Sequence, residues 1–171
     1  MAYTASLATQ VSLAGGFGFI GTGTWHHFLL DHSQPVHHSL GAGENLQDTL
    51  EAARDLIHKE IGPQDILPIG VGFIGWIIDK KGDQVQELFS LLFQYRVKAV
   101  WLSFSNDLRR LVNLIHDLNE KNAGVHRVLI FATVSSLEQA RAAIDWNVDV
   151  LNAQGMLILL KERTRGDPNA T

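Results

Sequence analysis

The stretch VLIFATVSSLEQARAAIDWNVDVL, residues 128–151, contains two apolar runs on either side of a helical pattern. The runs Val128–Val134 and Val148–Leu151 are rich in aliphatic residues and lack regular polar alternation. Such runs are typical of strands that are buried on both faces, as in parallel sheets. The stretch therefore predicts a βαβ unit, in which a crossover helix joins two parallel strands.

The helix between these runs has its own start signal. Ser135 and Glu138 have the spacing of a capping box, in which a hydroxyl and a carboxylate satisfy free N–H groups of the first turn. Apolar residues then recur at helical spacing, which predicts a stripe that faces the core. The residues of this stripe are Leu137, Ala140 and Ile144.

The same alternation extends through the rest of the chain. Buried strands are predicted over residues 17–21, 69–74 and 99–104, and helices over residues 4–14, 46–61, 85–93 and 108–118. Residues 25–43 have no clean period and are expected to form an irregular loop. The pattern predicts an α/β fold with about five parallel strands and crossover helices, as in a partial barrel or a doubly wound sheet.

Length and composition exclude several classes of protein. The chain has 171 residues, whereas a complete eight-fold βα barrel typically needs about 250. It has no cysteine, so disulfides, thiolate nucleophiles and cysteine-bound metals are excluded. Its formal net charge of -4 gives no basic excess for nucleic acid. The first residues carry no positive charge and no long apolar run, so we expect no signal peptide or membrane span and a cytoplasmic location.

Two candidate motifs do not meet the requirements of their chemistry. Gly15 and Gly16 follow a predicted helix and precede a strand, whereas a dinucleotide-binding glycine loop follows a strand and opens a helix. The histidines of the predicted loop have no pair at the i, i+4 spacing of a helical metal site, and we assign no metal site to them. They are His26, His27, His32, His37 and His38.

Three stretches together resemble the nitronate monooxygenase (2-nitropropane dioxygenase) family, particularly its fungal-type members. LATQVSLAGGFGFIGTGT (residues 7–24) is similar to the family's opening helix and second strand. LPIGVGFI (residues 67–74) is similar to its third barrel strand, and ATVSSLEQARAAIDWNVDVLNAQG (residues 132–155) to the segment that leads to its active-site loop. Members are FMN-dependent oxidoreductases, so the resemblance implies a partial TIM (βα)8-type barrel and FMN as cofactor.

The resemblance also implies five flavin-contacting positions. Met1 corresponds to the methionine at the end of the family's first strand, and Gly72 stands where many members have an asparagine. Thr133 stands where relatives have a Lys or Gln that reaches the flavin ring, and it can donate one hydrogen bond. Gln154 and Gly155 match the Gln-Gly that opens the active-site loop.

The family's catalytic histidine has no counterpart after this Gln-Gly. Relatives continue to Ala-Gly-Gly-His, whereas this chain continues MLILLK over residues 156–161, so we assign no catalytic residue. Two functions remain open. One is the FMN-dependent oxidation of alkyl nitronates to a carbonyl compound and nitrite, and the alternative is a non-catalytic fragment or interaction protein without bound flavin. A third interpretation, based on fold alone, is another barrel protein that binds a phosphorylated ligand.

The expected organisation is an incomplete flavin-barrel domain over residues 1–155 and a divergent tail over residues 156–171, truncated at both ends relative to the family. The expected small-molecule partner is a nitronate or nitroalkane. Because a partial parallel sheet has unpaired edges at its first and last strands, we also expect self-association through these open edges.

Overall fold

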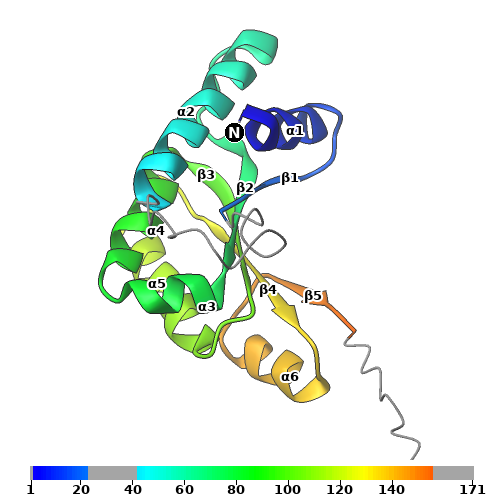
Figure 1. Ribbon diagram of the computed structural model, residues 1–171, viewed down its shortest axis with the longest axis vertical. Helices are drawn as coiled ribbons and strands as arrows, with labels where there is room; N and C mark the ends of the chain where they lie inside the picture. The colour runs from blue at the N-terminus through cyan, green and yellow to red at the C-terminus, as the bar shows by residue number, and fades with distance from the viewer. Residues whose placement is uncertain (1, 23–41, 156–171) are drawn as a thin grey trace, which may run out of the picture.

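Five parallel strands form one sheet in the computed structural model, which describes residues 2–22 and 42–155 (Figure 1). The strands pair in their sequence order, and each neighbouring pair is parallel. They are β1 (Gly18–Gly21), β2 (Leu67–Ile74), β3 (Val97–Ser103), β4 (Leu129–Val134) and β5 (Val150–Ala153). The prediction of an α/β fold with five parallel strands is confirmed.

A helix precedes each strand. These helices are α1 (Ala2–Leu13), α2 (Ala42–Ile61), α4 (Gln84–Gln94), α5 (Leu108–Lys121) and α6 (Leu137–Asp145). A short helix α3 (Gly75–Ile78) and a 3₁₀ turn (Asp79–Lys81) follow β2 and were not predicted, because the segment is too short to show a helical period. In the part of the chain that the structure describes, no helix has the length and apolarity needed to cross a bilayer.

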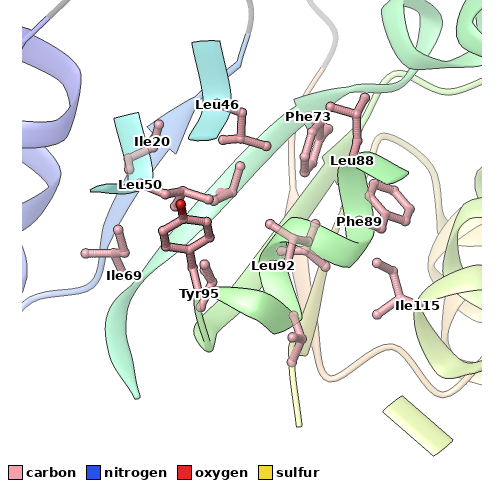
Figure 2. Close-up of a cluster of buried hydrophobic side chains, with 14 of the residues drawn as sticks. Ile20, Leu46, Leu50, Ile69, Phe73, Leu88, Phe89, Leu92, Tyr95 and Ile115 are labelled. Atoms are coloured by element: carbon pink, nitrogen blue, oxygen red, sulfur yellow. The ribbon is translucent and has the colours of Figure 1, made fainter. Parts of the chain in front are cut away.

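The hydrophobic core lies between one face of the sheet and the helices (Figure 2). Alternate residues of β2, Ile69, Val71 and Phe73, are buried there. The ring of Phe73 meets the ring of Phe89 from α4 at a centroid distance of 5.3 Å. Side chains from α1, α2, α4 and α5 belong to this same cluster, so these four helices cover the same face of the sheet.

The opposite face of the sheet, here called the open face, carries an aromatic cluster. It consists of Phe17, Phe19, Trp101 and Phe131. Phe19 contacts the rings of Trp101 and Phe131 edge-on, both at 5.3 Å between centroids. All four side chains are only partly buried, and no helix within residues 2–22 and 42–155 contributes to the cluster. Aromatic side chains therefore cover this face without a layer of helices.

Helix α6 packs differently from what its apolar stripe predicts, and α1 likewise turns small residues toward the sheet. Leu137 and Ile144 on α6 are 68% and 60% exposed, and α6 buries Ala143 instead. On α1, Leu7 is exposed while the small residues Ala5 and Ala8 are buried. The prediction that the α6 stripe faces the core is therefore wrong, because the small residues of these helices pack against the sheet.

The predicted cap of α6 is displaced by one residue. Ser136, not Ser135, caps α6, and its hydroxyl accepts the N–H of Gln139 at 3.1 Å. The side-chain oxygen of Gln139 accepts from the backbone N–H of Ser135 at 2.8 Å, so Gln139 performs the return contact expected of Glu138. α5 is capped in the same way by Asp107, whose carboxylate accepts the N–H of Arg110.

A polar contact ties α2 to the end of α4 at the margin of the core. The hydroxyl of Tyr95 donates to the carboxylate of Glu51 at 2.6 Å. This hydrogen bond, with a second from Gln47, lowers the pKa of Glu51. Burial and the same bond to Glu51 raise the pKa of Tyr95. The guanidinium of Arg54 lies 5.3 Å from the centre of the Tyr95 ring and adds a cation–π contact.

Gly18 is expected to be essential for the packing of α1 on β1. A Cβ at this position would overlap the backbone of Ala8, whereas a Cβ at Gly21 in the same strand would have no heavy atom within 4 Å. Gly18→Ala should destabilise the protein by about 1–3 kcal/mol, the range for overpacking, and Gly21→Ala should change stability by less than about 0.5 kcal/mol. Urea unfolding of both variants measures the difference, and equal stabilities would contradict the close approach.

The Tyr95–Glu51 contact should make stability depend on pH. Because the pKa of Glu51 is lowered in the folded state, its contribution is present above the ordinary value of 4.5 and is lost as pH falls through the lowered pKa. Because the pKa of Tyr95 is raised in the folded state, the contribution of Tyr95 to stability is present below its ordinary value of 10.0. This contribution is lost as the pH rises through the raised pKa. The stability difference between wild type and Tyr95→Phe, measured from pH 3 to pH 7, should therefore shrink toward pH 3. A difference that is constant with pH would contradict this account.

Candidate functional site

A cavity of about 510 Å³ opens at the carboxyl ends of β3, β4 and β5. Ligands of parallel α/β proteins bind at this edge of the sheet, where the loops after the strands converge. The lining residues come from the segments that follow β3 and β5, from the end of β4 and from α6 with its flanks. They are Phe104, Ser105, Asn106, Leu108, Thr133, Ser135, Gln139, Trp146, Gln154 and Gly155.

Thr133 is positioned in this cavity by β4 and by a neighbour on the open face. The indole N–H of Trp101 donates to its Oγ1 at 2.8 Å. A threonine hydroxyl has one donor in addition to its acceptor sites, so Oγ1 can still donate to a ligand. The Trp101 bond thereby orients the hydroxyl and leaves its proton available.

Gln154 and Gly155 form the wall of the cavity next to β5. The backbone N–H of Gln154 donates to the carbonyl of Val134 at 2.9 Å and holds this segment beside the end of β4. No heavy atom lies within 4 Å of the place where a Cβ of Gly155 would stand, so a ligand can approach its backbone closely. The structure thus brings together Thr133, Gln154 and Gly155, three of the five predicted site residues.

The other two predicted positions are not part of this lining. Gly72 lies in β2, where its carbonyl accepts from both the backbone N–H and the hydroxyl of Thr22, at 3.0 and 2.9 Å. A Cβ on Gly72 would come no closer than 3.7 Å to the carbonyl oxygen of Ile20, so the position has room for a side chain. Met1 lies outside the described residues, as do the histidines of residues 26–38.

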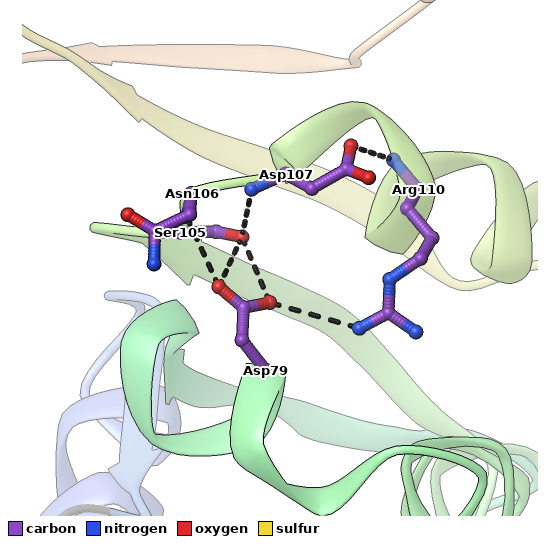
Figure 3. A network of polar contacts seen from close by, with 5 residues as sticks. All are labelled: Asp79, Ser105, Asn106, Asp107 and Arg110. Carbon is purple, nitrogen blue, oxygen red and sulfur yellow. Dashed lines mark hydrogen bonds and ion pairs between the residues drawn. The ribbon is translucent and has the colours of Figure 1, made fainter.

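A carboxylate clamps the loop that follows β3 (Figure 3). Asp79 accepts from the hydroxyl of Ser105 with both oxygens at 3.1 Å and from the backbone N–H of Asn106 at 3.0 Å. Arg110 lies 3.7 Å from the same carboxylate. Gly75 allows this close approach, because a Cβ there would overlap Ser105. The wall of the cavity next to β3 is therefore held rigidly to the segment after β2.

The aromatic residues of the lining were missed in the sequence. Phe104 has φ +57°, which is rare for a residue with a side chain, and its ring is 56% exposed. Trp146 follows α6 and contributes a second aromatic wall. A positive φ at a phenylalanine cannot be recognised from a single sequence. The position of Trp146 in the sequence is typical of the end of an amphipathic helix.

Among the residues that the structure describes, the lining has no titratable side chain. It consists of amide, hydroxyl, aliphatic and aromatic groups with glycine, without Asp, Glu, His, Lys, Arg or Tyr. The described cavity can therefore bind and orient a neutral ring by packing and hydrogen bonds. It has no side chain to serve as a general acid or base, or as a cation for a phosphate.

Two other hollows are separate from this cavity. One, of about 470 Å³, lies between the starts of α4 and α5, and another, of about 950 Å³, lies near the segment before β4 and includes His116 and His126. Within residues 2–22 and 42–155, no three His, Asp or Glu side chains are grouped so that they could hold a metal ion. Of these three hollows, the cavity at the carboxyl ends of β3, β4 and β5 contains Thr133, Gln154 and Gly155, for which the family resemblance implies flavin contact.

Comparison with protein-family models, with curated proteins and with solved structures finds no match to this chain. The convergence of Thr133, Gln154 and Gly155 is the main geometric observation.

Removal of the Asp79 carboxylate should loosen the loop after β3. Asp79→Ala leaves the Ser105 hydroxyl and the Asn106 N–H without their acceptor, and hydrogen bonds to a charged group contribute about 1.5–3 kcal/mol. We expect a loss of unfolding free energy in that range. Asp83→Ala is the matched control, because this exposed carboxylate makes no capping bond to α4. Equal effects of the two substitutions would contradict the clamp.

Proposed function

We propose that this protein is a flavin-binding βα protein of the nitronate monooxygenase kind and that it binds the ring of FMN at the carboxyl edge of its sheet. The observation that carries the proposal is the convergence of Thr133, Gln154 and Gly155 in one cavity. The resemblance to the family implies flavin contact at these three positions, although they are up to 22 residues apart in the sequence. Their meeting at the edge where barrel enzymes bind ligands supports the proposal.

The order of the strands favours a partial barrel over a doubly wound sheet. A doubly wound sheet reverses its strand order at a switch point and carries helices on both faces. Here the order is sequential, and side chains from four helices share one core cluster on a single face. The open face then corresponds to the interior of a barrel, where side chains from successive strands pack together.

The lining suits the flavin ring better than its phosphate. A volume of about 510 Å³ lies within the roughly 300–1,000 Å³ of small-molecule sites. Phe104, Leu108 and Trp146 offer apolar contact, and Thr133 and Gln154 offer hydrogen bonds to the polar edge of the ring. The phosphate finds no cation among these lining residues.

The cofactor and the protein contribute different parts of the proposed chemistry. When bound, FMN would supply the redox chemistry, and the cavity residues, among them Thr133 and Gln154, would position its ring. The cavity residues hold the ring and keep water from part of its surface. Because the described residues of the lining include no general base, we propose that the substrate enters as the ionised nitronate, not as the neutral nitroalkane.

A second candidate, a non-catalytic interaction protein, is favoured by the surface at the β5 end of the sheet. The apolar stripe of α6, which includes Leu137 and Ile144, is exposed, as is Val150 on β5. Within the described residues, β1 and β5 each pair on one side only. Such an edge offers free N–H and C=O groups to another chain, which supports the proposed self-association through the open edges.

Titration with FMN separates these two functions. The wild-type protein should bind FMN and change its visible spectrum, and Thr133→Val should weaken binding about 2–12-fold through the loss of one hydrogen bond worth about 0.5–1.5 kcal/mol. Ser90→Ala on α4, whose hydroxyl bonds only within its own helix, is the matched control and should bind as wild type does. Absence of binding, together with a dimer in sedimentation, would favour the interaction protein.

A further inference from the structure

We propose that Phe104 is a stacking platform for a planar heterocyclic ligand in the cavity at the carboxyl edge. This inference rests on the proposed function and assigns a specificity role to a residue that the family resemblance does not single out. Three observations support it: a rare backbone conformation, an exposed ring that lines the cavity, and a clamp on the residues that follow.

The backbone of Phe104 is strained. Its φ of +57° is in the left-handed region, which a residue with a Cβ rarely adopts. Packing of the side chain against the protein does not compensate for this strain, since Phe104 is 56% exposed. Residues held in such conformations occur preferentially at ligand-binding sites, where the surrounding structure enforces them.

The other two side-chain-bearing residues with positive φ have an ordinary structural reason. Arg96 (φ +51°) and Asn147 (φ +56°) each come directly after the C-cap of a helix, α4 and α6 respectively. A left-handed residue at this position is a common way to end a helix. Phe104 follows a strand, β3, so helix termination does not explain its conformation.

Hydrogen bonds to Phe104 and to the two residues after it hold the backbone in this conformation. The carbonyl of Phe104 accepts from the backbone N–H of Trp76 at 3.0 Å. The next two residues, Ser105 and Asn106, are bound by the carboxylate of Asp79. This clamp therefore holds the loop in the conformation that presents the Phe104 ring at the cavity, and it does so before any ligand arrives.

The chemistry of the surroundings selects the class of ligand. An exposed aromatic residue in a cavity whose described lining carries no charged side chain favours a flat, uncharged aromatic system, which gains contact area by stacking. Thr133 and Gln154 in the same lining would hydrogen-bond the polar edge of that system. A flavin ring has this combination of a flat face and a polar edge.

The test compares FMN with lumiflavin, which keeps the ring and lacks the ribityl phosphate. Phe104→Gly removes the aromatic ring and permits φ +57° without strain, so its unfolding midpoint should be equal to or above that of wild type. Its affinity for both ligands should fall by the same factor, about tenfold or more, as expected when an aromatic stack is lost. Phe104→Asn, which tolerates the left-handed region and also lacks the ring, should give the same loss.

Two controls isolate the ring from the backbone. Phe104→Tyr keeps an aromatic face and should retain wild-type affinity. Arg96→Gly relieves the same type of backbone strain before β3, at the other end of the strand from the cavity, and should also retain wild-type affinity. Unchanged affinity in Phe104→Gly, or a loss confined to FMN, would overturn the stacking role and leave the proposed flavin site in place. Failure of the wild-type protein to bind either ligand would overturn both.

Discussion

Parallel pairing of the five strands in sequence order is the constraint on which the rest of this structure depends. Crossovers between parallel strands are almost always right-handed, so a sheet whose order never reverses receives its helices on one face. The buried face is accordingly aliphatic, with Ile69 and Val71 in the core, and the open face is aromatic. The same constraint places every loop after a strand at one edge, where the cavity lies.

The sequence predicts the strands and helices well, but it predicts poorly which helix side chains pack against the sheet. Apolar runs such as Val128–Val134 identify strands because both faces of the sheet carry apolar side chains, and helical spacing identifies the crossovers. The packing of α6 differs from the prediction, because Leu137 and Ile144 stay exposed while Ala143 packs inward. Local spacing shows which residues share a helix face, but it does not show how closely that helix approaches the sheet.

The polar part of the candidate site could be predicted from the sequence, whereas its aromatic wall could not. The family resemblance identifies Thr133, Gln154 and Gly155, and parallel topology brings the ends of β4 and β5, where these residues lie, to the same carboxyl edge. Phe104 and the Asp79 clamp depend on a backbone angle and on contacts between distant residues, which leave no periodic signal. The cavity therefore combines a predictable polar edge with an aromatic wall that only the structure reveals.

Location of the flavin ring tests the central claim most directly. Isotope-filtered NOE measurements between added FMN and the labelled protein can detect protons within about 5 Å of the ring. The account predicts contacts from the dimethylbenzene and ring protons of FMN to the Thr133 methyl group and to the Phe104 ring, which line the same cavity. Contacts confined to residues of another hollow, such as Val125 near the segment before β4, would contradict it.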